Sequence, residues 1–310
     1  MRLKEGITEF VRRKILLAVL SLVIGLIGVG CAEEPLEICA DGVKVTEITL
    51  YEGQRLQLTA SQGQDTQVWS MDHEEIANVE PDGVLTAKQA GVATVTLTAG
   101  WNTAQAVIQV LPGRTVWTIG DSIFDYRDNS DTDMVQTIFY TAGYSELYMD
   151  NVAGSTIRSA RDMGILDHIA SGLYEQWEKP DLIVIFRGTN DCYFALQQPN
   201  IFAGEEDLDQ AVEQTCAYFR QLQPQAKIVW ITPLWRFDLP QSDLDEVRQT
   251  LHEICPRYDV EVFDIHLQGT FAELNYDNHW MLLYDGIHLH DIGASDMTEI
   301  LGEYLAEMDE

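Results

Sequence analysis

Along residues 112–310, strand-like apolar runs alternate with segments that have the residue spacing of helices. The strand-like apolar runs are residues 115–119, 147–152, 181–186, 227–231 and 260–265. Between them lie segments with apolar side chains every three or four positions, most clearly residues 208–222, 242–255 and 294–308. Such alternation predicts parallel strands joined by crossover helices, so we expect an α/β domain with three layers around a parallel sheet.

Candidate site residues follow three of the predicted strands. Ser122, Gly154 and Asn190 each come shortly after a strand-like run. Ligands of open α/β sheets bind beyond the carboxyl ends of the strands. We therefore expect these three residues to converge at one edge of the sheet.

The residue types at this edge suit nucleophilic catalysis. Ser122 lies in the string Gly-Asp-Ser-Ile, and Asp285 precedes His288 by three residues. A serine hydroxyl needs a base to remove its proton, and a nearby carboxylate can orient that base. The backbone N–H groups of Ser122 and Gly154 and the amide of Asn190 could surround a developing oxyanion.

Each of these residues also has an ordinary structural interpretation. Ser122 suits a helix N-cap, Gly154 a tight turn and Asn190 a loop hydrogen bond. His288 could be a surface turn residue. A metal site formed by Asp285, His288 and His290 is a further alternative; we expect neither a metal nor an organic cofactor.

Residues 43–111 contain short runs in which polar and apolar residues alternate, separated by turn signals. This pattern is typical of β-strands and predicts a small antiparallel sandwich. The order Trp-Ser, Ala-Asn-Val, Gly-Val-Leu-Thr-Ala and Gly-Val-Ala-Thr-Val resembles the bacterial Ig-like domain, group 2. That resemblance implies a spacer or adhesive unit. We expect Trp69 to pack in the sandwich core, with a ligand-stacking role as the alternative.

Four short motifs within residues 114–308 resemble those of the SGNH hydrolases, the GDSL esterase/lipase superfamily. They match its blocks in order: Gly-Asp-Ser, a glycine block, Gly-x-Asn-Asp and Asp-x-x-His. The resemblance implies a flavodoxin-like fold in which Ser122 is the nucleophile, His288 the base and Asp285 its orienting acid. It also makes Ser122, Gly154 and Asn190 the oxyanion donors. The chain departs from the usual pattern in having Gly-Asp-Ser-Ile for Gly-Asp-Ser-Leu and Ala-Gly-Ser-Thr for Ser-Gly-Asp-Thr.

The N-terminus has the pattern of an export signal. The bases Arg12, Arg13 and Lys14 precede an apolar stretch, residues 15–29, which ends at Gly30 and Cys31. This ending resembles the bacterial lipobox, which implies lipidation of Cys31; a plain signal peptide or a retained anchor is the alternative. We predict a signal peptide over residues 1–30, a linker over 31–42, and an exported cell-surface lipoprotein.

The net charge and the spacing of the cysteines limit the classes of ligand that the chain is expected to bind. The 310 residues include 50 acidic and 19 basic ones, a formal net charge of −31, which disfavours nucleic acid and anionic membranes as ligands. Cys39, Cys192, Cys216 and Cys255 lack Cys-x-x-Cys spacing, so a zinc site is not expected. Cys216 and Cys255 could pair in an exported protein, or remain buried thiols.

Together these features predict an exported serine esterase that acts on acyl esters, above all O-acetyl groups on carbohydrate. Membrane association is expected through the N-terminal lipid only. A lipid-directed esterase of the same fold and a non-catalytic glycan-binding adhesin are the alternatives. Trp235 and Phe237, after the fourth strand, could line a sugar pocket or simply pack.

Overall fold

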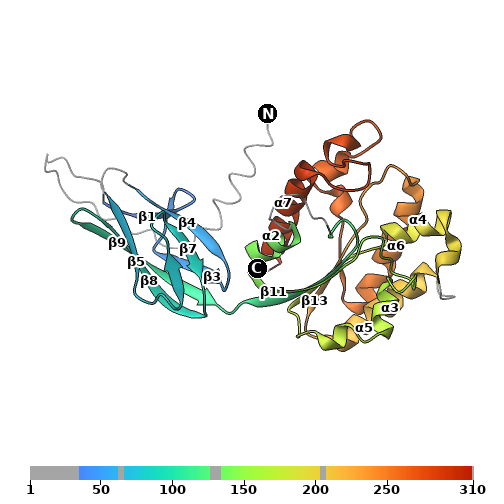
Figure 1. Ribbon diagram of the computed structural model, residues 1–310, viewed down its shortest axis with the longest axis horizontal. Coiled ribbons are helices and arrows are strands. Elements are labelled where there is room, and N and C mark those ends of the chain that lie inside the picture. Colours follow the sequence, from blue (N-terminus) through green and yellow to red (C-terminus); the bar gives the residue numbers. More distant parts are fainter. Residues whose placement is uncertain (1–34, 62–65, 126–133, 203–206, 309–310) are drawn as a thin grey trace. The chain divides into compact units, whose positions relative to one another are not determined.

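The computed structural model describes residues 35–61, 66–125, 134–202 and 207–308 (Figure 1). The predicted signal segment and Cys31 lie outside these ranges and stay predictions. Within the described ranges, no helix is both long and apolar enough to cross a membrane.

Among the residues that the structure describes, the N-terminal region contains two β-sheets. The first has the order β2-β1-β4-β7-β6 and the second the order β3-β9-β8-β5. All pairings are antiparallel except that of β3 with β9. The strands are β1 (Ile38–Ala40), β2 (Val43–Lys44), β3 (Glu47–Tyr51), β4 (Arg55–Ala60), β5 (Gln67–Met71), β6 (Ala77–Val79), β7 (Val84–Ala87), β8 (Gly91–Ala99) and β9 (Asn102–Leu111).

One apolar core holds these two sheets, because alternate side chains of each strand point inward. Leu58, Leu85, Leu97 and Ile108 are fully buried there, and Trp69 packs against the cluster in a half-buried position. The expected all-β region is confirmed. Strand β1, which pairs with β4, lies in the stretch predicted as a linker, because inward side chains such as Ile38 join the core and residues 38–40 continue the sheet.

In the described part of the C-terminal region, the strands form a parallel sheet with the order β11-β10-β12-β13-β14. Its strands are β10 (Arg114–Gly120), β11 (Tyr144–Asn151), β12 (Leu182–Phe186), β13 (Lys227–Ile231) and β14 (Glu261–Phe263). Numbered along the chain, this is the order 2-1-3-4-5 of flavodoxin-like folds. The predicted fold class is therefore confirmed.

Helices cover both faces of this sheet (Figure 1). They are α2 (Met134–Thr141), α3 (Ile165–Ala170), α4 (Thr189–Gln197), α5 (Leu208–Leu222), α6 (Gln241–Ile254) and α7 (Asp291–Glu307). Short 3-10 turns span Tyr174–Gln176, Pro199–Ile201, Cys255–Tyr258, Ile265–Leu267, Gly269–Glu273 and His279–Met281.

Strand β12 shows how the two faces are filled, since all five of its side chains are buried. Val184 and Phe186 belong to a core that includes side chains of α2 and α7. Ile183 and Ile185 belong to the opposite core, with side chains of α3, α5 and α6. A strand buried on both faces reads as a continuous apolar run, as the Leu-Ile-Val-Ile-Phe sequence does.

Parallel strands bring their carboxyl ends to one edge. Ser122 follows β10, Gly154 follows β11 and Asn190 follows β12 by a few residues. The segment between β14 and α7 carries Asp285 and His288. Neighbouring strands thus supply the three loops that were expected to meet.

Candidate active site

Ser122, His288 and Asp285 form a continuous hydrogen-bonded series. Nε2 of His288 lies 2.9 Å from Oγ of Ser122, although the two residues are 166 positions apart in sequence. Nδ1 of His288 lies 2.7 Å from Oδ2 of Asp285. A carboxylate only accepts hydrogen bonds, so Nδ1 carries the proton and Nε2 is left as the base facing the serine.

Asp285 is fixed by its own turn. Its Oδ1 accepts hydrogen bonds from the backbone N–H groups of Ile287 (2.9 Å) and His288 (2.8 Å). Burial raises the pKa of Asp285, but hydrogen bonds from the backbone and ring of His288 outweigh burial and leave the pKa below its usual value. Asp285 therefore stays a carboxylate and holds the imidazole in one orientation.

The turn that presents Ser122 is tight and buried on one side. Oδ1 of Asp121 accepts a hydrogen bond from the N–H of Ile123 at 3.0 Å. A Cβ on Gly120 would lie 2.5 Å from Cβ of Phe124, so only glycine fits there. Complete burial raises the pKa of Asp121 to about 6, although Ile123, Arg187 and the more distant charges lower it.

Gly154 lies in a left-handed backbone conformation, with φ of +79°, that other residues rarely adopt. A Cβ built there would meet nothing within 4 Å, so the residue borders open space. The next residue ties this loop to the nucleophile turn, because Oγ of Ser155 donates to the carbonyl of Gly120 at 3.0 Å.

Asn190 is joined to the same loop. Its Nδ2 donates to the carbonyl of Ser155 at 2.9 Å, and the side chain is buried. An amide nitrogen has two N–H groups, so one remains after this bond. Gly188, with φ of +129°, makes the sharp turn from β12 into α4, which carries Asn190.

Asp191 has a structural role that the sequence did not reveal. Its buried carboxylate accepts from the N–H of Ile157 (2.7 Å) and from the N–H and Nε of Arg158 (3.2 Å each). Burial raises the pKa of Asp191 despite these bonds. The loop after Gly154 is thereby anchored to the start of α4.

A buried network beneath the site was also missed. Arg187 donates to the carbonyls of Gly120 (3.0 Å) and Asp150 (2.8 Å), and its guanidinium pairs with the Asp150 carboxylate at 3.0 Å. His168 (2.7 Å) and Tyr174 (2.6 Å) bind the same carboxylate. Burial opposes the charge on Asp150, but these partners lower its pKa overall. The available signals were a charged residue directly after an apolar strand, at Arg187, and a charged residue inside a strand-like run, at Asp150.

His290 does not join the series. Its Nδ1 accepts from the N–H of Ile292 (3.1 Å), which caps α7, and its Nε2 donates to the carbonyl of Trp280 (3.1 Å). Among the described residues, no group of three or more His, Cys, Asp or Glu side chains is arranged to hold a metal ion.

Two other predictions concerned aromatic and thiol side chains. Trp235 is buried against Tyr276 and His279, whereas half of Phe237 is exposed. The sulfur atoms of Cys216 and Cys255 lie 3.8 Å apart as buried free thiols in contact.

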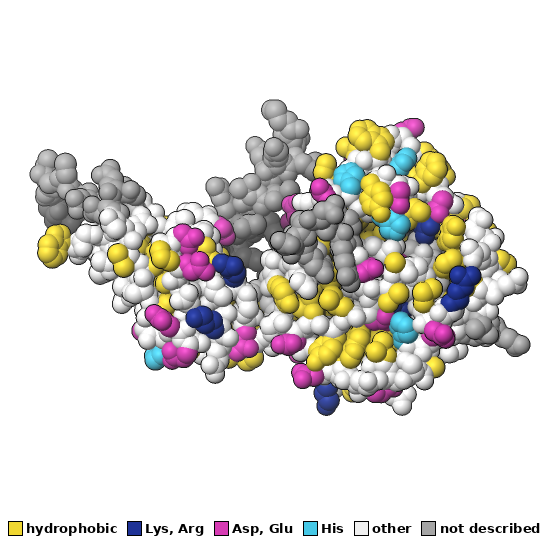
Figure 2. All heavy atoms as spheres, viewed as in Figure 1, with side chains coloured by type: hydrophobic (Ala, Val, Ile, Leu, Met, Phe, Trp, Pro, Cys, Tyr) yellow, Lys and Arg dark blue, Asp and Glu magenta, His cyan; other side chains and the backbone are white. Residues whose placement is uncertain are grey.

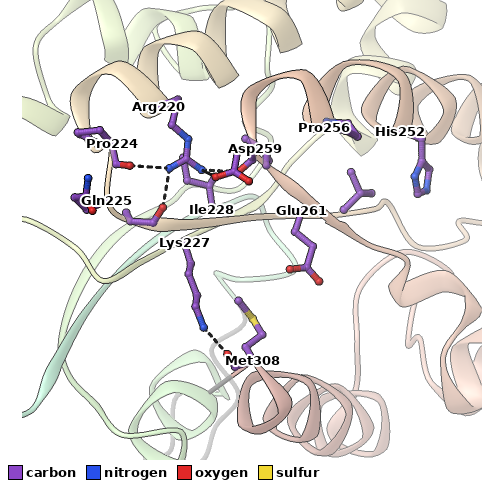
Figure 3. A pocket seen from close by; sticks show the side chains of 13 residues that line it. Arg220, Pro224, Gln225, Lys227, Ile228, His252, Pro256, Asp259, Glu261 and Met308 are labelled. Atoms are coloured by element: carbon purple, nitrogen blue, oxygen red, sulfur yellow. Dashed lines mark hydrogen bonds and ion pairs between the residues drawn. The ribbon is translucent and has the colours of Figure 1, made fainter. Parts of the chain in front are cut away.

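A hollow of about 670 Å³ lies at the opposite end of the sheet, by the amino ends of β13 and β14 (Figure 3). Arg220 donates there to the carbonyls of Tyr258 (3.0 Å) and Ala226 (2.9 Å), and Lys227 donates to the carbonyl of Met308. Both cationic side chains are therefore hydrogen-bonded to backbone carbonyls of the protein. The hollow lies at the amino ends of the strands, whereas Ser122 lies at the carboxyl ends.

Several solved structures resemble this chain in fold. One is a putative GDSL-like lipase from Parabacteroides merdae, with 19% identity, 63% coverage of this chain, 95% of that chain and a TM-score of 0.47. Another is an acetylxylan esterase from Geobacillus stearothermophilus, with 17% identity, 62% and 94% coverage and a TM-score of 0.49. A third is an α/β hydrolase from the metagenome of Lake Arreo, Spain, with 19% identity, 63% and 96% coverage and a TM-score of 0.46.

Comparison with curated proteins finds no match. The model of the GDSL-like lipase/acylhydrolase family matches residues 118–295, which is more than half of the chain and includes all four motif blocks. The chain therefore belongs to the GDSL-like lipase/acylhydrolase family and is a serine carboxylic ester hydrolase.

Proposed function

We propose that this protein is an exported, surface-anchored esterase that removes short acyl groups, above all O-acetyl groups, from carbohydrate. The observation that carries the chemistry is the series Ser122–His288–Asp285, with contacts of 2.9 and 2.7 Å. Serine, imidazole and carboxylate in this order are the parts that acyl transfer through a covalent intermediate requires.

In the proposed reaction, Nε2 of His288 takes the proton of Ser122 while Oγ attacks the ester carbonyl. The negative charge that develops on the carbonyl oxygen is held by the N–H groups of Ser122 and Gly154 and by the free N–H of Asn190. His288 then gives its proton to the leaving alcohol, and water, activated by the same imidazole, releases the acid. Each oxyanion donor is expected to contribute about 10²–10³ in rate.

Anchoring rests on the sequence pattern at residues 1–31. In this proposal the lipid on Cys31 holds the enzyme at the cell surface, and the all-β region acts as a spacer of the Ig-like type. The variant Cys31→Ser, expressed in a bacterial host fed with a labelled fatty acid, should lose the label and leave the membrane. A label that persists in this variant contradicts the proposed anchor.

The substrate is tested with the purified wild-type protein and Ser122→Ala. We expect wild type to release acetate from acetylated oligosaccharides, and Ser122→Ala to lose this activity while its circular dichroism spectrum is unchanged. Faster release of fatty acid from a lysophospholipid would favour a lipid-directed esterase. Glycan binding without acetate release would favour an adhesin, and loss of activity with a chelator would favour a metal-dependent reaction.

A further inference from the structure

Three exposed aromatic side chains lie on or near the loop that carries Asp285 and His288, here called the catalytic loop. They are Phe237, Tyr276 and Tyr284, here called the aromatic rim. Their exposed fractions are 50%, 59% and 66%. We propose that the rim is the subsite for the alcohol portion of the ester, and that this portion is a neutral sugar ring. The inference rests on the proposed function and adds which residues recognise the substrate.

The chemistry of the leaving group decides which side of the substrate meets the rim. His288 must give its proton to the alcohol oxygen, so this oxygen lies close to Nε2 when the ester bond breaks. The carbonyl oxygen must point instead toward Gly154 and Asn190. Groups beside the imidazole therefore touch the alcohol portion. Tyr284 is such a group, because its ring stacks on that of His288 with centroids 5.8 Å apart and planes at 21°.

Phe237 is fixed against the same loop. Its backbone N–H donates to the carbonyl of Gly286, between Asp285 and His288, at 2.8 Å. A Cβ on Gly286 would lie 2.6 Å from Cβ of Phe237, and φ of Gly286 is +82°. This close approach holds the phenyl ring beside the catalytic loop.

The ring of Tyr276 packs edge to face against the ring of Phe237. Its centroid lies 5.5 Å from that of Phe237, with the planes at 71°, and 5.3 Å from that of buried Trp235. Edge-to-face contacts of this kind hold aromatic rings in place. Trp235, which is buried in the apolar core, thus supports the rim through its contact with Tyr276.

The exposure of the rim itself calls for a partner. Large apolar side chains gathered on a surface mark binding sites more often than scattered ones do. Figure 2 shows hydrophobic and histidine side chains gathered over the segment between β14 and α7. Tyr276, Tyr284 and the buried Trp235 all belong to or contact this segment.

The rim fits a sugar ring better than a lipid chain. Tyrosine offers an apolar ring face together with a hydroxyl that makes hydrogen bonds, which matches the C–H face and hydroxyl groups of a pyranose. Acidic Asp277 and Asp285 adjoin the two tyrosines in sequence, and the chain carries a formal net charge of −31. Like charges repel, so neutral glycans are favoured over those that contain uronic acids or phosphate.

The test compares esters of one acid with different alcohols. Rates of acetate release are measured for an acetylated neutral oligosaccharide, for the corresponding acetylated oligouronide and for ethyl acetate, whose alcohol has no ring. In Phe237→Ala and Tyr276→Ala, we expect kcat/KM for the neutral sugar ester, divided by that for ethyl acetate, to fall at least tenfold, mainly through KM. Phe237→Tyr should restore most of the ratio, and the matched control Tyr140→Ala, an exposed tyrosine on α2, should keep it.

Binding is measured separately by titration calorimetry of Ser122→Ala with the acetylated neutral oligosaccharide, with and without Phe237→Ala. We expect the second substitution to weaken Kd at least tenfold. An unchanged ratio and unchanged Kd, or a preference for the oligouronide, would overturn the inference while leaving the esterase intact. Absence of Ser122-dependent hydrolysis of all three esters would instead refute the proposed function, and the inference with it.

Discussion

Replacing the buried carboxylate beside the nucleophile should change how stability depends on pH. In the folded protein, burial raises the pKa of Asp121 from 3.8 to about 6. The folded state therefore binds this proton more tightly than the unfolded state does. The contribution of Asp121 to the free energy of unfolding is complete below its pKa in the unfolded state. This contribution is lost as pH rises through its pKa in the folded state.

The rise in the pKa of Asp121 corresponds to about 3 kcal/mol of unfolding free energy, at about 1.4 kcal/mol for each pH unit. About 2 kcal/mol of this should be lost between pH 4.5 and pH 7. The variant Asp121→Asn keeps an oxygen that can accept from the N–H of Ile123 but does not ionise. The free energy of unfolding of wild type minus that of the variant should thus fall by about 2 kcal/mol over this interval.

The assay is urea unfolding followed by tryptophan fluorescence at several pH values. Subtracting the variant removes the contributions of all other titrating groups. Asp277→Asn, which changes an exposed carboxylate, serves as the control. Parallel curves for Asp121→Asn and wild type between pH 4.5 and 7 would refute the claim that burial holds a proton on Asp121.

Three further substitutions probe the site. Asp285→Asn should lower kcat about 10⁴-fold, because the imidazole loses the acceptor that fixes its tautomer; steady-state kinetics at constant pH would show this, and a loss below tenfold would contradict it. Asn190→Ala should lower kcat about 10²–10³-fold with little change in KM, if its amide serves the oxyanion; an effect on KM alone would speak against that role. Asp191→Ala should destabilise the protein by about 2–3 kcal/mol in urea unfolding, because it leaves the buried N–H of Ile157 without its acceptor and the partly buried Arg158 without its carboxylate; a change under 1 kcal/mol would show that the loop after Gly154 is held by other contacts.

Local patterns predicted the regular elements well. Helix α5 spans Leu208–Leu222, as the spacing of its apolar residues predicted, because Asp207 caps its start and its buried face repeats every three or four residues. Strand β13 has the predicted bounds, Lys227–Ile231, since a run buried on both faces is continuous in sequence. The shorter helices α2, α3 and α4 were not predicted, because six to nine residues give too few repeats.

The motif residues could be named from the sequence because their chemistry lies in short blocks. The residues that hold these motif residues in place could not be named from the sequence. Arg187 and Asp150 are 37 positions apart and meet only because β11 and β12 flank β10. Trp235 and Phe237 likewise both contact Tyr276, which a distant segment contributes. Sequence patterns show which residues are apolar, but tertiary packing decides which of them stay open to a substrate.

The central claim is that Ser122 is a nucleophile activated by His288, at 2.9 Å. It is tested most directly by treating the protein with a fluorophosphonate and locating the adduct by peptide mass spectrometry. We predict one modified residue, Ser122, loss of esterase activity in proportion to labelling, and labelling slowed by several orders of magnitude in His288→Ala. An adduct on another residue, or full activity after Ser122 is labelled, would contradict the account.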